Sequence, residues 1–97
     1  MAQVNAITTT TTGVCADFIR LGPGDHILDF TWAGSAGNAD LQNRNHGGTF
    51  RDSYDADGVV NITANKSVRV SGSQDYTVDV NTHTSALTVT PTACDRP

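Results

Sequence analysis

Hydrophobic and polar residues alternate with a period of two along most of this chain. The clearest case is the range 25–32, where Leu28, Phe30 and Trp32 share one face and polar residues occupy most of the other. Alternation over a stretch of this kind predicts a β-strand that buries one face and exposes the other. Shorter patterns of the same type recur, and no segment has a helical period long enough to predict a helix.

Turn-forming residues divide these patterns into eight or nine short predicted strands, a spacing typical of a β-sandwich or barrel. The strands are expected at 4–12, 14–21, 25–32, 39–45, 49–54, 59–64, 67–71, 75–81 and 85–91. We therefore predict an all-β fold: a single small β-sandwich or jelly-roll-like domain of about eight short antiparallel strands. Residues 1–12 are expected to form an N-terminal arm or an edge strand, and residues 13–97 the sandwich.

Two stretches about half a chain apart share one pattern: a strand with an arginine, a glycine turn, and an alternating strand. The first reads "RLGPGDHILDF" from Arg20, and the second reads "RVSGSQDYTVDV" from Arg69. They are either a duplicated hairpin or two hairpins that look alike because alternating hairpins generally do. In both cases we expect related positions in the sandwich, with the matched apolar residues in one core: Leu28, Phe30, Val78 and Val80.

Composition supports the strand prediction. The 97 residues include no Glu, one Lys and fourteen Thr, and Thr favours strands whereas Glu and Lys favour helices. The formal net charge is −4 and the six basic residues are scattered. Nucleic-acid binding and attraction to an anionic membrane both need clustered basic residues. We therefore expect no nucleic-acid partner and no membrane partner.

Candidate catalytic and metal-binding patterns are weak. The acidic residues Asp25, Asp29, Asp75 and Asp79 fall on the polar faces of the two repeated strands; a solvated acidic face is favoured over a site for a divalent ion. Asp55 and Asp57 before Gly58 predict a turn rather than a calcium loop. The three His residues have no ligand spacing, and no nucleophile or phosphate-binding motif is present. We expect no enzyme, no cofactor and no small-molecule substrate.

Cys15 and Cys94 permit one disulfide, but two free thiols are favoured, because the opening "MAQVNAITTTTTG" does not have the pattern of a secretion signal. We expect synthesis in the cytoplasm. Trp32 and Tyr54 could provide aromatic platforms for a sugar. Because Trp32 continues the buried face of its strand, a core or interface position is favoured for it.

The pattern of a Thr-rich N-terminal segment, "LGPGDHILDFTW", "GTF" and "VRVSGSQDYTVDVNTHTSALTV" resembles small virion proteins of tailed bacteriophages. The resemblance is one of pattern and composition over most of the chain, without a diagnostic motif. It implies a capsid decoration (cement) protein: a sandwich or jelly roll that binds the major capsid protein as a homotrimer and clamps neighbouring subunits. It also implies a place on the capsid surface of the virion.

The surfaces expected to contact a capsid are the N-terminal segment, the region 33–47 and the C-terminal tail. The individual contact residues we predict are Val4, Ile7, Trp32, Arg44, Tyr54 and Arg96. One rival hypothesis is a carbohydrate- or receptor-binding module of a phage fibre or head appendage. The other is a small enzyme or metal protein.

Overall fold

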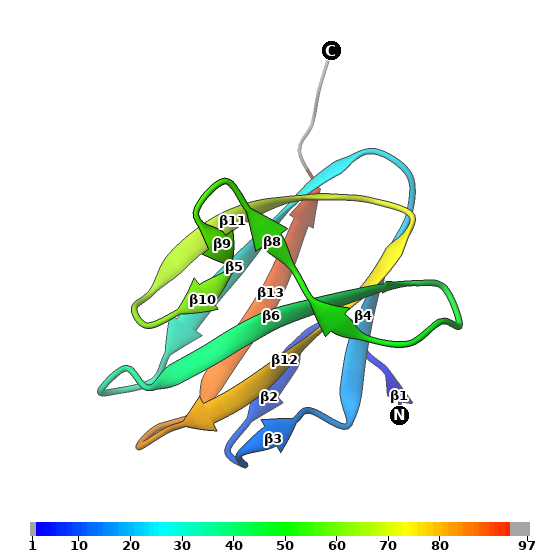
Figure 1. Cartoon of the computed structure of the whole chain (residues 1–97). Coiled ribbons are helices and arrows are strands. Elements are labelled where there is room, and N and C mark those ends of the chain that lie inside the picture. The colour runs from blue at the N-terminus through cyan, green and yellow to red at the C-terminus, as the bar shows by residue number, and fades with distance from the viewer. Residues whose placement is uncertain (1, 94–97) are drawn as a thin grey trace.

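Two β-sheets packed face to face contain the alternating segments of the chain (Figure 1). The computed structural model describes residues 2–93, which contain strands, turns and loops and no helix. The predicted all-β sandwich is confirmed. The predicted strand at 25–32 is confirmed with the same bounds, and residues 39–45 belong to a strand that is one residue longer.

The first sheet has the order β1-β4-β12-β6-β10, with two further short strands at its sides. These five strands are β1 (Ala2–Gln3), β4 (Asp17–Leu21), β12 (Gln74–Thr82), β6 (Asn38–Asn45) and β10 (Asn61–Ile62). Beside them, β3 (Gly13–Val14) pairs with β12, and β7 (Arg51–Asp52) pairs with β6.

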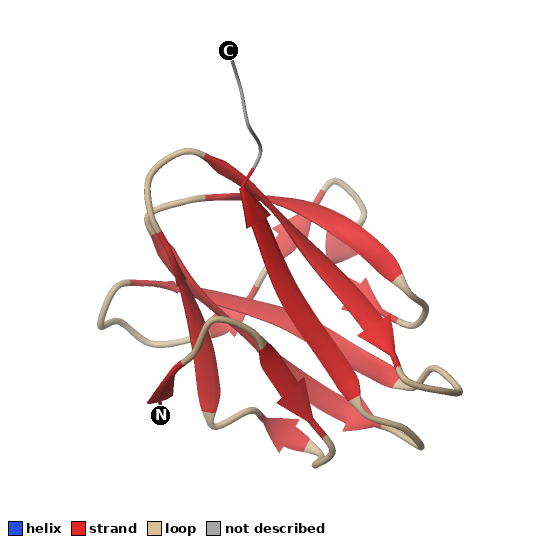
Figure 2. Cartoon of the chain, turned by 180° about the vertical axis from the view of Figure 1, so that it is seen from behind, coloured by secondary structure: helices blue, strands red, loops and turns tan. Residues whose placement is uncertain are grey.

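The second sheet has the order β11-β5-β13-β2 and lies in front in Figure 2. Its strands are β11 (Lys66–Ser71), β5 (Asp25–Trp32), β13 (Leu87–Ala93) and β2 (Ile7–Thr9). A separate ribbon pairs β8 (Tyr54–Asp55) with β9 (Gly58–Val59).

Eight of these thirteen strands pair in the pattern of a jelly roll. In chain order they are β2, β4, β5, β6, β10, β11, β12 and β13. The outermost strands of this list pair first and the innermost last: β2 pairs with β13, β4 with β12, β5 with β11, and β6 with β10, all antiparallel. Two further pairs, β5 with β13 and β6 with β12, complete two four-stranded layers, as in a jelly roll of two Greek keys.

The remaining short strands depart from the expected eight antiparallel strands. They are β1, β3, β7, β8 and β9, each of two residues, and β1 runs parallel to β4. The N-terminal segment does not project from the domain over residues 2–12. Instead β2 forms the edge of the second sheet, and β1 lies along the first. Its backbone therefore pairs within this chain, as an edge strand rather than a projecting arm.

The two repeated stretches are not hairpins, because each one crosses from one sheet to the other. The first connects β4 to β5 and the second connects β11 to β12, so their strands pair with one another: β4 with β12, and β5 with β11. The two turns are in contact, since the Gly72 amide donates to the Gly24 carbonyl at 2.7 Å. A Cβ on Gly72 would lie 1.9 Å from the Gly22 carbonyl oxygen. The two repeated stretches are therefore neighbouring connections at which the chain crosses between the sheets. We call them the two corners of the jelly roll.

The core lies between the two sheets. Leu28, Phe30, Val78 and Val80 are each at most 2% exposed and belong to one cluster, as predicted for the matched apolar residues. Alternation produces this result, because it directs every second side chain of β5 and β12 between the sheets.

Candidate functional site

A fully buried carboxylate lies on the outer face of the first sheet. Asp75 of β12 is 0% exposed and lies in register between Arg20 of β4 and Arg44 of β6. Arg20 donates from Nε to Oδ1 at 2.8 Å and from Nη2 to Oδ2 at 3.2 Å, and Arg44 donates from Nε to Oδ2 at 2.8 Å. His46 Nε2 lies 3.6 Å from Oδ1. We call these four residues the carboxylate cluster.

Two aromatic rings cover the carboxylate cluster. The guanidinium carbon of Arg44 lies 4.7 Å from the ring centre of Phe18 and 4.3 Å from that of Phe50, and the two rings are in tilted contact. Arg20 also lies over Phe18, at 5.6 Å. Phe50 belongs to the segment between β6 and β7, where Arg44 Nη1 donates to the Gly48 carbonyl. Cation–π contacts and a backbone hydrogen bond therefore fold this segment over the sheet.

The electrostatics of the cluster hold Asp75 ionised. The hydrogen bond from Arg20 lowers the pKa of Asp75 below its ordinary value, against the opposing effect of burial, with further help from Arg44 and His46. The same hydrogen bond raises the pKa of Arg20. A carboxylate whose two oxygens already accept three charged hydrogen bonds is a poor base, because its proton affinity is reduced. The cluster is therefore suited to fixing strands together rather than to transferring protons.

The expected solvated acidic face is wrong for Asp75, which is buried against two arginines because β12 is a central strand. Asp25 is exposed, and Arg69 Nη1 lies 3.6 Å from its Oδ2. The four carboxylates of the repeat do not form a metal site. Among residues 2–93, no group of three or more His, Cys or acidic residues is placed to hold a metal ion.

The outer face of the second sheet carries mostly hydroxyl side chains. Thr88 of β13 lies in register between Thr8 and Thr31, and the hydroxyl oxygens of Thr8 and Thr88 are 3.4 Å apart. We call this surface the threonine face. Its members are Thr8, Thr31, Ser67, Ser71, Thr88, Thr90 and Thr92, all exposed except the half-buried Thr88. Asp25, Asp29 and Arg69 are the charged residues beside them, and Ser67 donates to Asp29.

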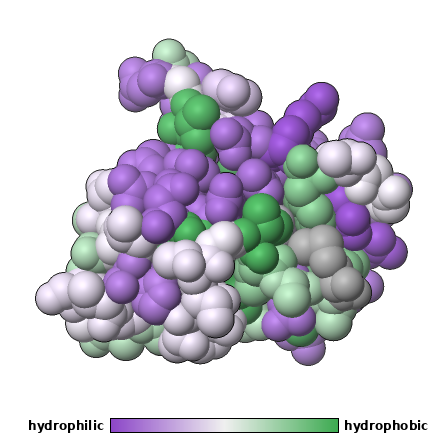
Figure 3. Space-filling model, turned by 60° about the horizontal axis from the view of Figure 1, so that its bottom comes forward, coloured by the Kyte–Doolittle hydropathy of each residue, from purple (hydrophilic) through white to green (hydrophobic). Residues whose placement is uncertain are grey.

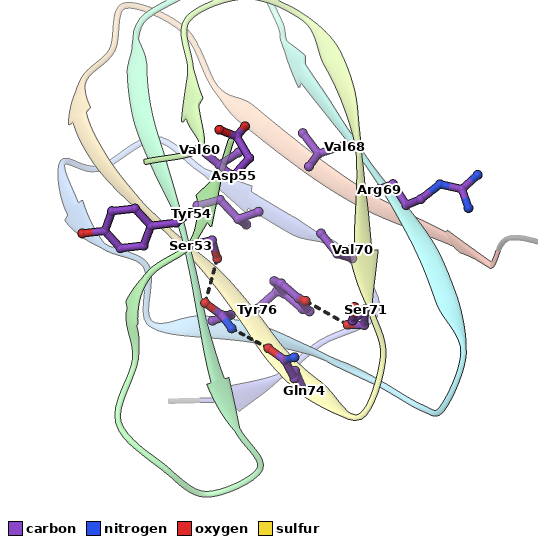
Figure 4. A pocket seen from close by; sticks show the side chains of 12 residues that line it. Ser53, Tyr54, Asp55, Val60, Val68, Arg69, Val70, Ser71, Gln74 and Tyr76 are labelled. Atoms are coloured by element: carbon purple, nitrogen blue, oxygen red, sulfur yellow. Dashed lines mark hydrogen bonds between the residues drawn. The ribbon is translucent and has the colours of Figure 1, made fainter. Parts of the chain in front are cut away.

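A cavity of about 240 Å³ opens between the two sheets beside β11 (Figure 4). Its apolar lining comes from Val68 and Val70 of β11 and from Leu41, Val60 and Tyr76 opposite. Its polar lining comes from Asn43, Ser53, Tyr54, Asp55, Arg69, Ser71 and Gln74. We call this cavity the groove.

Most polar groups of the groove already have partners. Ser53 Oγ donates to Asn43 Oδ1 at 2.8 Å, and Asn43 Nδ2 donates to Gln74 Oε1. The Tyr76 hydroxyl donates to the Ser71 carbonyl at 2.8 Å, and burial raises the pKa of this tyrosine. The groove therefore combines an apolar lining with polar groups that already hydrogen-bond within the chain.

The predicted contact residues do not form one surface. Ile7 and Trp32 are 1% and 3% exposed, because both point into the core, so neither is available to a partner. Val4 packs on the core, and Arg44 belongs to the carboxylate cluster. Tyr54 is 72% exposed, with its ring directed away from the groove (Figure 4). Arg96 lies outside the described residues. The region 33–47 contains β6, with loops on either side.

Two smaller expectations concern a turn and the cysteines. The turn between β8 and β9 is confirmed: the Asp57 amide donates to Asp55 Oδ1 at 2.8 Å, and Gly58 has a φ of 116°. Cys15 is a buried thiol. Cys94 lies outside the described residues, so two free thiols, favoured over a disulfide, stay a prediction.

Comparison with known proteins identifies no relative. No protein-family model matches the chain, and no curated protein or solved structure is significantly similar to it. Within residues 2–93, no helix has the length and apolar character to cross a membrane.

Proposed function

We propose that this chain is a capsid decoration (cement) protein of a tailed bacteriophage, which binds the major capsid protein as a homotrimer and stabilises the head shell. Its place is the capsid surface, after synthesis in the host cytoplasm. The proposal takes its partner from the resemblance in sequence pattern. The jelly-roll pairing supports it, since this architecture is common among viral capsid domains.

The observation that carries the proposal is the threonine face. The row Thr8–Thr88–Thr31 carries hydroxyl side chains and no charge, and the charged residues of this face, Asp25, Asp29 and Arg69, lie further along the sheet. Such a row is suited to contact with another protein, because charged residues are depleted at the centre of protein interfaces. The opposite sheet instead has its outer face partly covered by the segment that carries Phe50. Viewed from the end of the sandwich near β3, apolar side chains form only separate patches among polar ones (Figure 3).

Binding through such a face needs no strong single contact. Each copy would make weak contacts, and three linked copies on a symmetric shell would bind together, so that avidity supplies the affinity. The mechanism is one of shape and hydrogen bonding at many equivalent sites. It uses no cofactor and no chemical step.

The direct test is co-sedimentation of the purified protein with undecorated capsids of its own phage, together with native mass determination. We expect binding in multiples of three copies and a trimer on the particle. Thr31→Glu, in the Thr8–Thr88–Thr31 row of the threonine face, should weaken binding by about tenfold or more, because an unpaired charge must be desolvated. The matched control is Thr82→Glu at the exposed end of β12 on the other sheet, which should bind normally. A monomer that does not sediment with capsids would overturn the proposal.

A second candidate function is a carbohydrate- or receptor-binding module of a phage fibre or head appendage. The exposed ring of Tyr54 beside the groove favours it, whereas the buried Trp32 no longer does. This function predicts binding to cell-surface glycans that is lost in Tyr54→Ala. A glycan array without any such binding would count against it.

A further inference from the structure

We propose that the groove and the free edge of β11 form a binding site for an extended segment of another polypeptide, which adds a strand to the second sheet. The segment would place apolar side chains into the groove at alternate positions. It would also carry an acidic residue beside Arg69. The site adjoins the threonine face at Ser71 and Arg69 but consists of the groove and the outer edge of β11, and the inference does not depend on the partner being a capsid protein.

The first observation is the length of the β11 edge. β11 ends the second sheet and pairs only with β5 among the described residues, over six registered positions. The other strands that end a sheet are much shorter: β1 and β10 have two residues each, and β2 has three. Short edge strands discourage pairing with other chains, whereas a long edge presents a row of backbone donors and acceptors to an incoming strand.

The second observation is the position of the groove directly beside this edge. Figure 4 shows Val68 and Val70 directed into the groove from β11, with Arg69 directed away from it. Val68 is only half-buried, although it lies on the inward face of its sheet. A strand added beside β11 would alternate in the same way, so that every second side chain would cover Val68 from within the groove.

The size and the polarity of the groove favour side chains over a whole small molecule. Its volume of about 240 Å³ is below the range of about 300–1,000 Å³ for most small-molecule sites. Three of its polar side chains hydrogen-bond in a row, from Ser53 to Asn43 and from Asn43 to Gln74. Few polar groups of the groove are therefore free to recognise the hydroxyl groups of a sugar. An extended peptide instead brings its own backbone partners for β11 and apolar groups for the groove.

Charge complementarity fixes one feature of the partner. Arg69 projects from the outer face of β11, is largely exposed, and has Asp25 at 3.6 Å as its acidic neighbour. Lys66, the other basic residue of β11, is also exposed. Opposite charges on directly paired strands attract, and like charges repel. An aspartate or glutamate opposite Arg69 would therefore set the register of the added strand.

The experiment is an NMR titration of the ¹⁵N-labelled full chain with synthetic peptides. The first peptide alternates valine and threonine and has one aspartate at its centre among the outward residues. The second is identical but has lysine in place of the aspartate, and the third has the same composition as the first in an order without alternation. We expect the first peptide to shift and protect the amides of β11, with smaller effects at Val60 and Tyr76 and none at β2. The lysine peptide should bind more weakly, and the scrambled peptide should not bind.

Two variants test the two halves of the site. Arg69→Glu is an exposed substitution that should weaken binding of the aspartate peptide by about threefold to tenfold and strengthen binding of the lysine peptide. Val68→Phe should fill the groove and abolish binding; a matching amide spectrum elsewhere would show that it is folded. Thr82→Glu, at the exposed end of β12 on the other sheet, is the control and should bind as the unaltered chain does.

Several results would overturn the inference. They are the absence of binding by the aspartate peptide at millimolar concentration, shifts confined to surfaces other than β11, and equal effects of Arg69→Glu on both charged peptides. Self-association through β11 without peptide would show that a second copy occupies the edge. Binding of oligosaccharides at the same amides, without peptide binding, would show that the groove is a sugar site. Each of these outcomes is independent of co-sedimentation with capsids.

Discussion

The two corners of the jelly roll have similar sequences and equivalent positions, but their ion pairs lie in different environments. In each, the arginine of one repeated stretch pairs with the aspartate of the other: Arg20 with Asp75, and Arg69 with Asp25. The first distance is 2.8 Å and its carboxylate is 0% exposed. The second is 3.6 Å, and its arginine and aspartate side chains are 57% and 53% exposed.

The neighbouring strands explain this difference. Asp75 lies on β12 between β4 and β6, so that a second arginine, Arg44, approaches from the other side and is covered by Phe50. Asp25 lies at the beginning of β5 and has Ser71 of β11 as its registered partner. The environment of a residue therefore depends on how many strands flank it, even where the local pattern of the sequence is the same.

The largest expected effect distinguishes the two aspartates. Asp75→Asn should lower the free energy of unfolding by about 3–5 kcal/mol, because it leaves the guanidinium groups over the sheet without their anion. Asp25→Asn should change it by at most about 1 kcal/mol, because exposed ion pairs contribute little. Denaturant unfolding, followed by the fluorescence of the single buried Trp32, measures both. Equal effects would contradict the contrast between the corners.

A second comparison concerns the glycines where the corners meet. Gly72→Ala should destabilise the fold by about 1–3 kcal/mol, because its Cβ would lie 1.9 Å and 2.5 Å from the carbonyl oxygens of Gly22 and Gly24. Gly22→Ala is the control: no atom lies within 4 Å of its added Cβ, and we expect a change of about 0.5 kcal/mol or less. Thermal unfolding of both variants tests this contact. A tolerated Gly72→Ala would mean that the two turns are further apart.

A smaller change in stability is expected when Phe50, the ring that lies over Arg44 of the carboxylate cluster, is replaced. Phe50→Leu should lower the free energy of unfolding by about 0.5–1.5 kcal/mol, because it removes one ring from Arg44 and one aromatic contact from Phe18. Tyr54→Leu replaces an aromatic residue that is 72% exposed, and we expect little change. If the two substitutions cost the same, the segment over the sheet does not stabilise the cluster.

Much of the fold could be predicted from the sequence, because alternation is a local property. The strand at 25–32 and the core positions of Leu28 and Val78 follow directly from the period of two. The repeated pattern also correctly predicted related positions for its two copies. Its interpretation as hairpins was wrong, because a glycine turn permits both a hairpin within one sheet and a crossing between sheets.

The candidate sites were harder to predict because they depend on which strands become neighbours. Asp75 has the sequence signature of a solvated position on an amphipathic strand. Only the pairing with β4 and β6 shows that two arginines bury it. Ile7 looked available because the N-terminal segment has no clear inner face, yet its pairing with Val89 directs it into the core. Similarly, the β11 edge and the groove arise from the order of strands, which no local pattern encodes.

The pH dependence of unfolding tests the contrast between the corners most directly. Because the folded-state pKa of Asp75 is lowered, its carboxylate stabilises the fold above its unfolded pKa of about 3.9. This contribution is lost as the pH falls through the lower folded-state value. The unaltered chain and Asp25→Asn should therefore lose stability steeply below about pH 4, and Asp75→Asn should be less stable at neutral pH with a shallower acid dependence. If Asp75→Asn kept the full acid dependence, or if Asp25→Asn removed it, the buried ion pair would not be the stronger of the two.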